Sequence, residues 1–146
     1  MSIVVMLGCT EERIPEPYTF SSAISGDEYK VWQVSYYTFR EEGKADQTYG
    51  LQACDYDDQY YFYANDSRTY EIHSNILACG DEDDIFVEST WAVINARATL
   101  EIIVPFLSSE KIPWTIEDLD EKDFEISFYL NNRKSIHIFF ELVEEG

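Results

Sequence analysis

Basic side chains are scarce in this sequence. It holds 10 Lys and Arg against 29 Asp and Glu, which gives a formal net charge of −19. Because phosphates and carboxylates carry the same sign, a chain with this balance repels nucleic acid and is not expected to bind it. A folded domain with so much like charge also repels itself, which costs stability. The excess of acid therefore points either to a use for negative charge or to an unusual environment.

Long hydrophobic runs are missing as well. No segment approaches the roughly 18 apolar residues that a membrane span needs, and residues 1–8 lack the basic start and apolar length of a signal peptide. The three cysteines, Cys9, Cys54 and Cys79, lie far apart and include no pair at metal-ligand spacing. We expect reduced thiols and a cytoplasmic protein that does not bind membranes.

Motifs for nucleophilic catalysis and for phosphate binding are absent from the sequence, which has no Gly-x-Ser-x-Gly and no glycine-rich phosphate loop. The two histidines, His73 and His137, fall in strand-like runs, where a structural or surface role is far more common than that of a general base. The Asp55–Asp58 run is similar to the start of a calcium loop, but the required glycine and closing glutamate are missing at that spacing. We expect no enzymatic activity, no metal and no other cofactor.

What the sequence does contain is enough apolar material for a core. At 146 residues, of which 45% are hydrophobic, the chain is expected to form a single domain. Alternating apolar residues predict hairpins, most clearly Gln59–Ala64 with Thr69–His73 and Phe124–Leu130 with Ser135–Val143. The Glu28–Arg40 segment mixes polar and apolar residues on both faces, which is typical of a central or doubly covered strand.

One segment shows helical rather than strand spacing. Five apolar residues recur there at i, i+4, i+7, i+8 and i+11: Ala96, Leu100, Ile103, Val104 and Leu107. Asn95 suits the N-cap of such a helix, and Pro105 is expected to kink it. The predicted fold class is therefore α+β, an antiparallel β-sheet of several hairpins packed on one main α-helix at about residues 95–110.

The acids are placed unevenly, and one acidic run is interleaved with tyrosines. Tyrosine supplies contact area at low entropic cost, while a charged rim sets association rate and partner choice. Extra carboxylates also improve solubility, whereas acid that serves salt adaptation would be expected to spread more evenly. The candidate partner-binding residues are Asp55, Tyr56, Asp57, Asp58, Tyr60, Asp81, Glu82, Asp83, Asp84, Glu88, Glu117, Asp118, Asp120 and Glu121.

The segment from Asp84 to Trp114 ends in a polar turn, a proline and a tryptophan, at Phe106–Trp114. With the preceding hairpins at Thr48–Ala64, it resembles the bacterial immunity proteins that neutralise polymorphic or contact-dependent toxin domains delivered to neighbouring cells. The resemblance covers about half of the chain, judged by pattern. It implies an inhibitor without catalysis, bound to a toxin that is often a nuclease or deaminase, and it carries over no inhibitory residues.

The leading hypothesis is an acidic immunity protein that binds a basic toxin domain and blocks its active site or its substrate surface. One alternative is a phage or plasmid DNA mimic that inhibits restriction or CRISPR nucleases, which requires carboxylates spaced like phosphates along an extended face. A second alternative is a small metal-dependent enzyme, which requires carboxylates that converge in a pocket. The position of the acids in the folded chain separates these three hypotheses.

Overall fold

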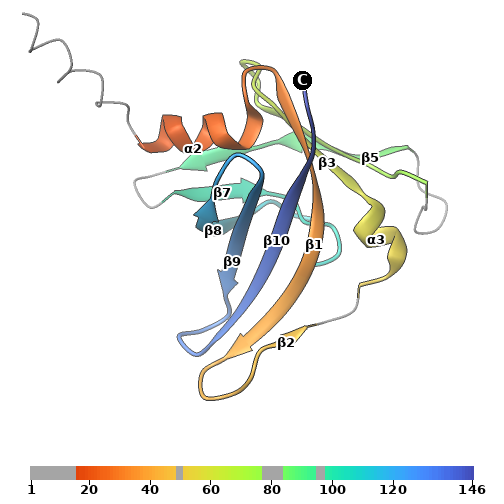
Figure 1. Cartoon of the computed structure of the whole chain (residues 1–146). Helices are drawn as coiled ribbons and strands as arrows, with labels where there is room; N and C mark the ends of the chain where they lie inside the picture. Colours follow the sequence, from red (N-terminus) through yellow and green to blue (C-terminus); the bar gives the residue numbers. More distant parts are fainter. Residues whose placement is uncertain (1–15, 49–50, 77–83, 95–97) are drawn as a thin grey trace, which may run out of the picture.

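The structure is a computed structural model that describes residues 16–48, 51–76, 84–94 and 98–146 (Figure 1). Its elements, in chain order, are α2 (Glu16–Ser25), β1 (Tyr29–Glu41), β2 (Gln47–Thr48), α3 (Ala53–Asp57), β3 (Gln59–Tyr63), β4 (Thr69–His73), β5 (Ile85–Thr90), β6 (Ala92–Ile94), β7 (Thr99–Ile102), β8 (Ile112–Leu119), β9 (Asp123–Tyr129) and β10 (Lys134–Glu145).

All ten strands form one antiparallel sheet that curls into a nearly closed barrel. The strand order is β5-β4-β3-β1-β10-β9-β8-β7-β6, with β2 paired to β1. The two end strands, β5 and β6, are joined by a single residue, Trp91, so one bent segment pairs with β4 on one side and with β7 on the other. Strands make up 57% of the residues and helices 10%, so the predicted α+β class is wrong.

The predicted main helix is a strand and a turn. Thr99–Ile102 forms β7, and Pro105 lies in the turn that follows it. Leu100, Ile102 and Val104 are all fully buried, and they recur at i, i+2 and i+4, which is the strand period. β-branched residues favour a strand, and Pro105 disfavours a helix. The proposed N-cap, Asn95, lies outside the described residues.

The longer observed helix, α2, was not predicted from the sequence. Pro17 stands in its first turn, where the missing N–H costs nothing. Gly26 ends it with a φ of 65° and donates its N–H to the Ser22 carbonyl at 2.8 Å. This left-handed conformation is the usual helix stop at glycine, so Pro17 and Gly26 together were the missed signal.

The predicted hairpins are largely confirmed. β3 pairs with β4, and β9 pairs with β10; β1 is central, between β3 and β10. In the Thr48–Ala64 segment, where hairpins were expected, only β2 pairs back with β1, and α3 follows before β3. Cys54 is disulfide-bonded, so the expectation of three reduced thiols is also wrong.

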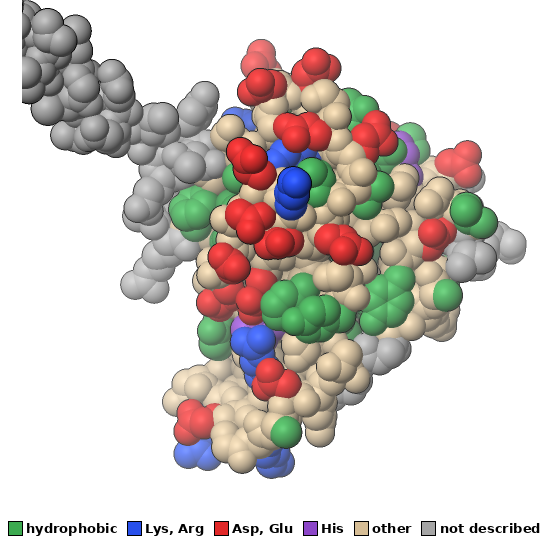
Figure 2. Space-filling model, in the orientation of Figure 1, with side chains coloured by type: hydrophobic (Ala, Val, Ile, Leu, Met, Phe, Trp, Pro, Cys, Tyr) green, Lys and Arg blue, Asp and Glu red, His purple; other side chains and the backbone are tan. Residues whose placement is uncertain are grey.

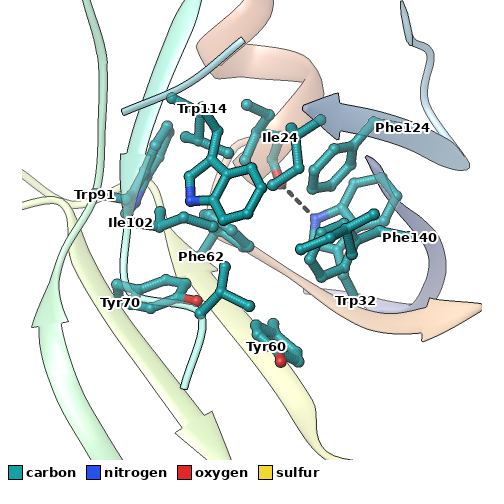
Figure 3. Packing of buried hydrophobic residues seen from close by; sticks show 14 of the residues in the cluster. Ile24, Trp32, Tyr60, Phe62, Tyr70, Trp91, Ile102, Trp114, Phe124 and Phe140 are labelled. Carbon is teal, nitrogen blue, oxygen red and sulfur yellow. Dashed lines mark hydrogen bonds between the residues drawn. The ribbon is translucent and has the colours of Figure 1, made fainter. Parts of the chain in front are cut away.

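The interior of the barrel is filled with aromatic side chains (Figure 3). Trp32 packs edge-on against Phe124, with ring centroids 4.7 Å apart, and Phe62 packs edge-on against Trp91 at 5.6 Å. Edge-to-face pairs of this kind add about 0.5–1.5 kcal/mol to the burial of their apolar surface. The inner face therefore serves mainly to stabilise the fold, and solvent meets the outer face.

A buried lysine links α2 to the turn after β8 by hydrogen bonds at one end of the barrel. Lys30 is 2% exposed, and its ammonium donates to the Ala23 carbonyl at 2.9 Å and to the Glu121 carbonyl at 3.0 Å. The Trp32 indole N–H donates to the neighbouring Ile24 carbonyl at 2.9 Å (Figure 3). A cation at the last carbonyls of a helix also interacts favourably with the helix dipole.

Replacing Lys30 by methionine is expected to lower the free energy of unfolding by about 2–5 kcal/mol, because the partly buried carbonyls of Ala23 and Glu121 lose their donor. Urea unfolding at pH 7, followed by tryptophan fluorescence, measures the change. Lys44→Met is the matched control, since the Lys44 side chain is 67% exposed and should shift stability by no more than about 0.5 kcal/mol. Equal midpoints for both variants would show that Lys30 does not hold this end closed.

Candidate functional site on the outer face of the sheet

Two β-bulges shape the outer face of the barrel. The pairing of β1 with β10 shifts between Val34 and Tyr36, and the pairing of β8 with β9 shifts between Ile116 and Asp118. A bulge places two successive residues on the same side of a strand. It therefore turns both Ser35 and Tyr36, and both Glu117 and Asp118, toward solvent.

A groove of about 390 Å³ lies on this outer face. It is lined by Ser35 and Tyr36 from β1, Asp118 from β8, Lys122 from the next turn, Asp123, Phe124 and Glu125 from β9, and Phe139, Phe140, Glu141 and Leu142 from β10. Figure 2 shows acidic side chains gathered over the front of the molecule, where these strands lie, next to a patch of hydrophobic side chains. We call this feature the acidic groove.

An aromatic pair forms part of the lining of the acidic groove. The rings of Tyr36 and Phe139 stack with centroids 4.1 Å apart and planes 16° apart, and Tyr36 is 44% exposed. The Arg40 guanidinium carbon already lies 6.0 Å from the Phe139 ring centroid. This contact is within the range of a cation–π interaction, so the pair is able to accept a cationic group.

Four carboxylates belong to the lining, from Asp118, Asp123, Glu125 and Glu141, and among the described lining residues Lys122 is the only cation. In the turn beside them, the Asp120 carboxylate accepts from the backbone N–H groups of Lys122 and Asp123 at 2.8 and 3.0 Å. These bonds lower the pKa of Asp120, whereas desolvation and the nearby Asp120 charge raise the pKa of Asp123. Desolvation is the main cause of the raised pKa of Asp123, and the negative charges of Asp120 and Asp118 add to it.

Three of the predicted contact residues from the 117–121 cluster come to this face. Asp118 lines the groove, and Glu117 accepts hydrogen bonds from the hydroxyls of Ser127 and Tyr129, the latter at 3.1 Å. Asp120 organises the adjacent turn. Glu121 is exposed at its side chain, while its backbone carbonyl binds Lys30. This cluster is the part of the predicted site that the structure brings together with an aromatic surface.

The predicted Asp55–Asp58 cluster is not part of the acidic groove. These residues lie in and just after α3, which adds nothing to the groove lining found among the described residues. The Asp57 carbonyl accepts from the Gln33 amide at 3.5 Å, Asp58 is 3% exposed, and Tyr56 packs against the core. Tyr60 is completely buried, so its prediction as a contact residue is wrong, because the alternation of β3 points it inward.

The remaining predicted residues lie elsewhere or cannot be placed. Asp81, Glu82 and Asp83 lie outside the described residues. Asp84 is exposed and its carbonyl accepts the Ser74 N–H at 2.8 Å. Glu88 of β5 stands opposite Glu71 of β4, several strands from the groove along the sheet.

The tyrosines of β3 that point outward are Tyr61 and Tyr63 rather than the predicted Tyr60. Tyr61 stacks on His73 with centroids 4.0 Å apart, and Tyr63 lies 5.6 Å from Tyr29. Burial, the Glu71 charge and a hydrogen bond to Glu71 raise the pKa of Tyr63 to about 12. Tyr63 therefore keeps its proton at neutral pH and donates to the Glu71 carboxylate at 3.4 Å.

Of the eleven residues that line the acidic groove, the sequence prediction named only Asp118; the missed ones include Tyr36, Asp123, Glu125, Phe139 and Glu141. Strand alternation in the last hairpin places Glu125 and Phe139 on its outer side, and they are Cα partners. That alternation was a usable signal. Tyr36 could not have been placed, because its outward position depends on a bulge.

A scan against protein-family models finds no match to this chain, and a search of curated proteins finds no relative. Among the described residues, no group of three or more His, Cys, Asp or Glu side chains is placed to hold a metal ion. Neither α2 nor α3, the helices in the part of the chain that the structure describes, is long and apolar enough to cross a membrane.

Proposed function

We propose that this chain is a protein-binding domain with a cationic partner, and that the acidic groove receives a lysine- or arginine-bearing segment of that partner. The observation that carries the proposal is that the stacked Tyr36–Phe139 pair and four carboxylates line the same groove. A guanidinium or ammonium group in the groove gains both ring contact and opposite charge. Aromatic residues and a charged rim are also the composition of protein interfaces.

The partner class that we propose is a basic toxin domain, which the chain would neutralise as an immunity protein by blocking an active site or a substrate surface. The acid content and the groove support this class. The resemblance to immunity proteins supports it less than the sequence suggested, because Phe106–Trp114 is a turn and a strand rather than a helix end. The disulfide at Cys54 likewise removes one of two arguments for a cytoplasmic location.

The compact groove favours a protein partner over nucleic-acid mimicry. A DNA mimic needs carboxylates along an extended face, whereas four of the acids here surround one volume of about 390 Å³ with an aromatic pair in it. A single side chain or a short segment fits this volume better than the docking face of a duplex-binding enzyme.

Affinity capture from the native host tests the proposal. The bait is the wild-type chain, and the comparison is Asp118→Lys with Glu141→Lys, two exposed positions in the groove lining. We expect a protein with a basic domain to be retained by the wild type and by the control Glu42→Lys with Glu110→Lys, which makes the same change in net charge at exposed sites elsewhere. Equal retention by the groove variant would contradict the proposal.

A further inference from the structure

Three polar side chains form a hydrogen-bonded series on the outer face, next to the acidic groove. Ser135 and His137 are two residues apart on β10, so their side chains point to the same side of the sheet. The Ser135 Oγ lies 2.8 Å from the His137 Nε2, and the His137 Nδ1 lies 2.6 Å from a Glu125 carboxylate oxygen. Glu125 comes from β9, and it also lines the groove.

The carboxylate fixes the direction of these hydrogen bonds. An ionised Glu125 can only accept, so the His137 Nδ1–H donates to it. The lone pair of a neutral His137 is then on Nε2, where it accepts the Ser135 hydroxyl proton. A serine, the histidine that can take its proton and the carboxylate that orients the histidine are the three parts of an activated nucleophile.

Two further polar side chains, those of Arg40 and Thr38, belong to the cross-strand partners of Ser135 and His137. Ser135 and His137 are 7% and 3% exposed, so bulk water competes weakly for their hydrogen bonds. Arg40, the cross-strand partner of Ser135, places a guanidinium nitrogen 3.7 Å from the same Glu125 oxygen. Thr38, the cross-strand partner of His137, has a buried hydroxyl without a hydrogen-bond partner among the described residues.

We propose that Ser135 is a catalytic nucleophile that cleaves carboxylic esters, with His137 as its general base and Glu125 as the residue that positions His137. The apolar part of the ester would lie along the adjoining groove, on the Phe139 ring. This activity goes beyond the binding function proposed above and does not depend on it.

The reaction proceeds by acyl transfer. The Ser135 Oγ forms a bond to the ester carbonyl carbon while its proton passes to the His137 Nε2. We assign the guanidinium of Arg40, the cross-strand partner of Ser135, to the negative oxygen of the tetrahedral intermediate. The bond to the leaving alkoxide then breaks, and the alkoxide takes the proton from His137. Water repeats the sequence at the acyl carbon, which releases the acid and returns the proton to Ser135.

A fluorophosphonate probe tests the nucleophile directly. Attack by the Ser135 Oγ on phosphorus expels fluoride and leaves a stable covalent adduct, which intact-protein mass spectrometry detects. We expect one adduct per chain, located at Ser135 by peptide mapping, and none in Ser135→Ala. The control is Ser127→Ala, which should take up the probe like the wild type. Ser127 is a buried serine on the same face of β9 as Glu125, but its hydroxyl bonds to Glu117 rather than to an imidazole.

Hydrolysis of p-nitrophenyl acetate tests the roles of the other two residues. His137→Gln is expected to lower kcat by about 10²-fold or more. Glu125→Gln is expected to lower kcat by at least tenfold with KM and the melting temperature nearly unchanged, which a purely structural role for Glu125 would not produce.

The proposal is overturned if the wild-type chain takes up no probe, or if the adduct maps to another residue. Peptide mapping on the wild type makes this outcome independent of whether any variant folds. Probe uptake at Ser135 and retention of a partner are separate measurements on the wild-type chain, so failure of the binding proposal and failure of the catalytic proposal are distinguishable.

Discussion

Reversing two charges in the acidic groove is expected to weaken the binding of a cationic peptide by about a hundredfold. At contact distance in water, one pair of unit charges is worth about 1 kcal/mol. Turning two attractions into two repulsions therefore changes the binding free energy by roughly 3–4 kcal/mol before screening, and a tenfold change in Kd corresponds to 1.4 kcal/mol. The variant is Asp118→Lys with Glu141→Lys, the probe is hexa-arginine, and calorimetry at 0.15 M salt measures Kd.

The control for this experiment is Glu42→Lys with Glu110→Lys, which has the same net charge as the groove variant. If general attraction to a chain of charge −19 drove binding, both variants would lose affinity equally. We expect the control to change Kd by less than threefold. The difference between the variants should also shrink in 1 M salt, where the Debye length falls to about 3 Å.

Replacing Trp91 by alanine is expected to lower the free energy of unfolding by about 3–5 kcal/mol, the usual cost of removing a buried large aromatic ring. Trp91 is the hinge between β5 and β6. Its indole N–H donates to the Tyr63 carbonyl and its backbone N–H to the Arg68 carbonyl, both at 2.9 Å. The Arg68 guanidinium carbon lies 4.9 Å from the centre of its ring.

The conservative variant Trp91→Phe separates ring packing from hydrogen bonding. It keeps most of the contact with Phe62 and loses the indole N–H, so we expect it to cost about 1–3 kcal/mol. Urea unfolding with circular dichroism compares the two variants. If Trp91→Ala unfolds at the wild-type midpoint, the bend at Trp91 does not close the barrel.

Local patterns were enough to predict the hairpins. The β9–β10 pair could be placed because its apolar residues alternate and its turn is polar. In that turn the Asn131 side chain accepts the backbone N–H groups of Arg133 and Lys134 at 2.7 and 3.0 Å. Such turns are determined by a few neighbouring residues, so sequence alone carries the information.

The prediction of a helix at residues 95–110 was wrong for a specific reason. Leu100 and Val104 are four residues apart, a spacing that helices and strands share. The residue that separates the two periods is Ile102, which is buried like its neighbours at i−2 and i+2. Choosing Ile103 instead of Ile102 produced a helical stripe and an α+β fold class. In the folded chain this segment is a strand because β7 pairs with both β6 and β8.

Most of the acidic groove was not predictable from the sequence, because bulges change the direction of side chains. In β1, Trp32 and Val34 are buried, whereas the shift at Ser35 leaves Tyr36 exposed and Tyr37 packed against the core. This change of phase explains why both faces of the segment look mixed in the sequence. Glu117 and Asp118 could be selected for their charge, but their aromatic neighbours Tyr36 and Phe139 required the register of the folded sheet.

Chemical-shift mapping on the isotope-labelled chain, titrated with hexa-arginine, tests the central claim most directly. We predict that the largest amide shifts fall on Tyr36, Asp118, Glu125 and Glu141, with little change in α3 or at Glu88. Shifts spread evenly over all acidic residues, or concentrated at Asp55–Asp58, would contradict the claim that the acidic groove is the docking site.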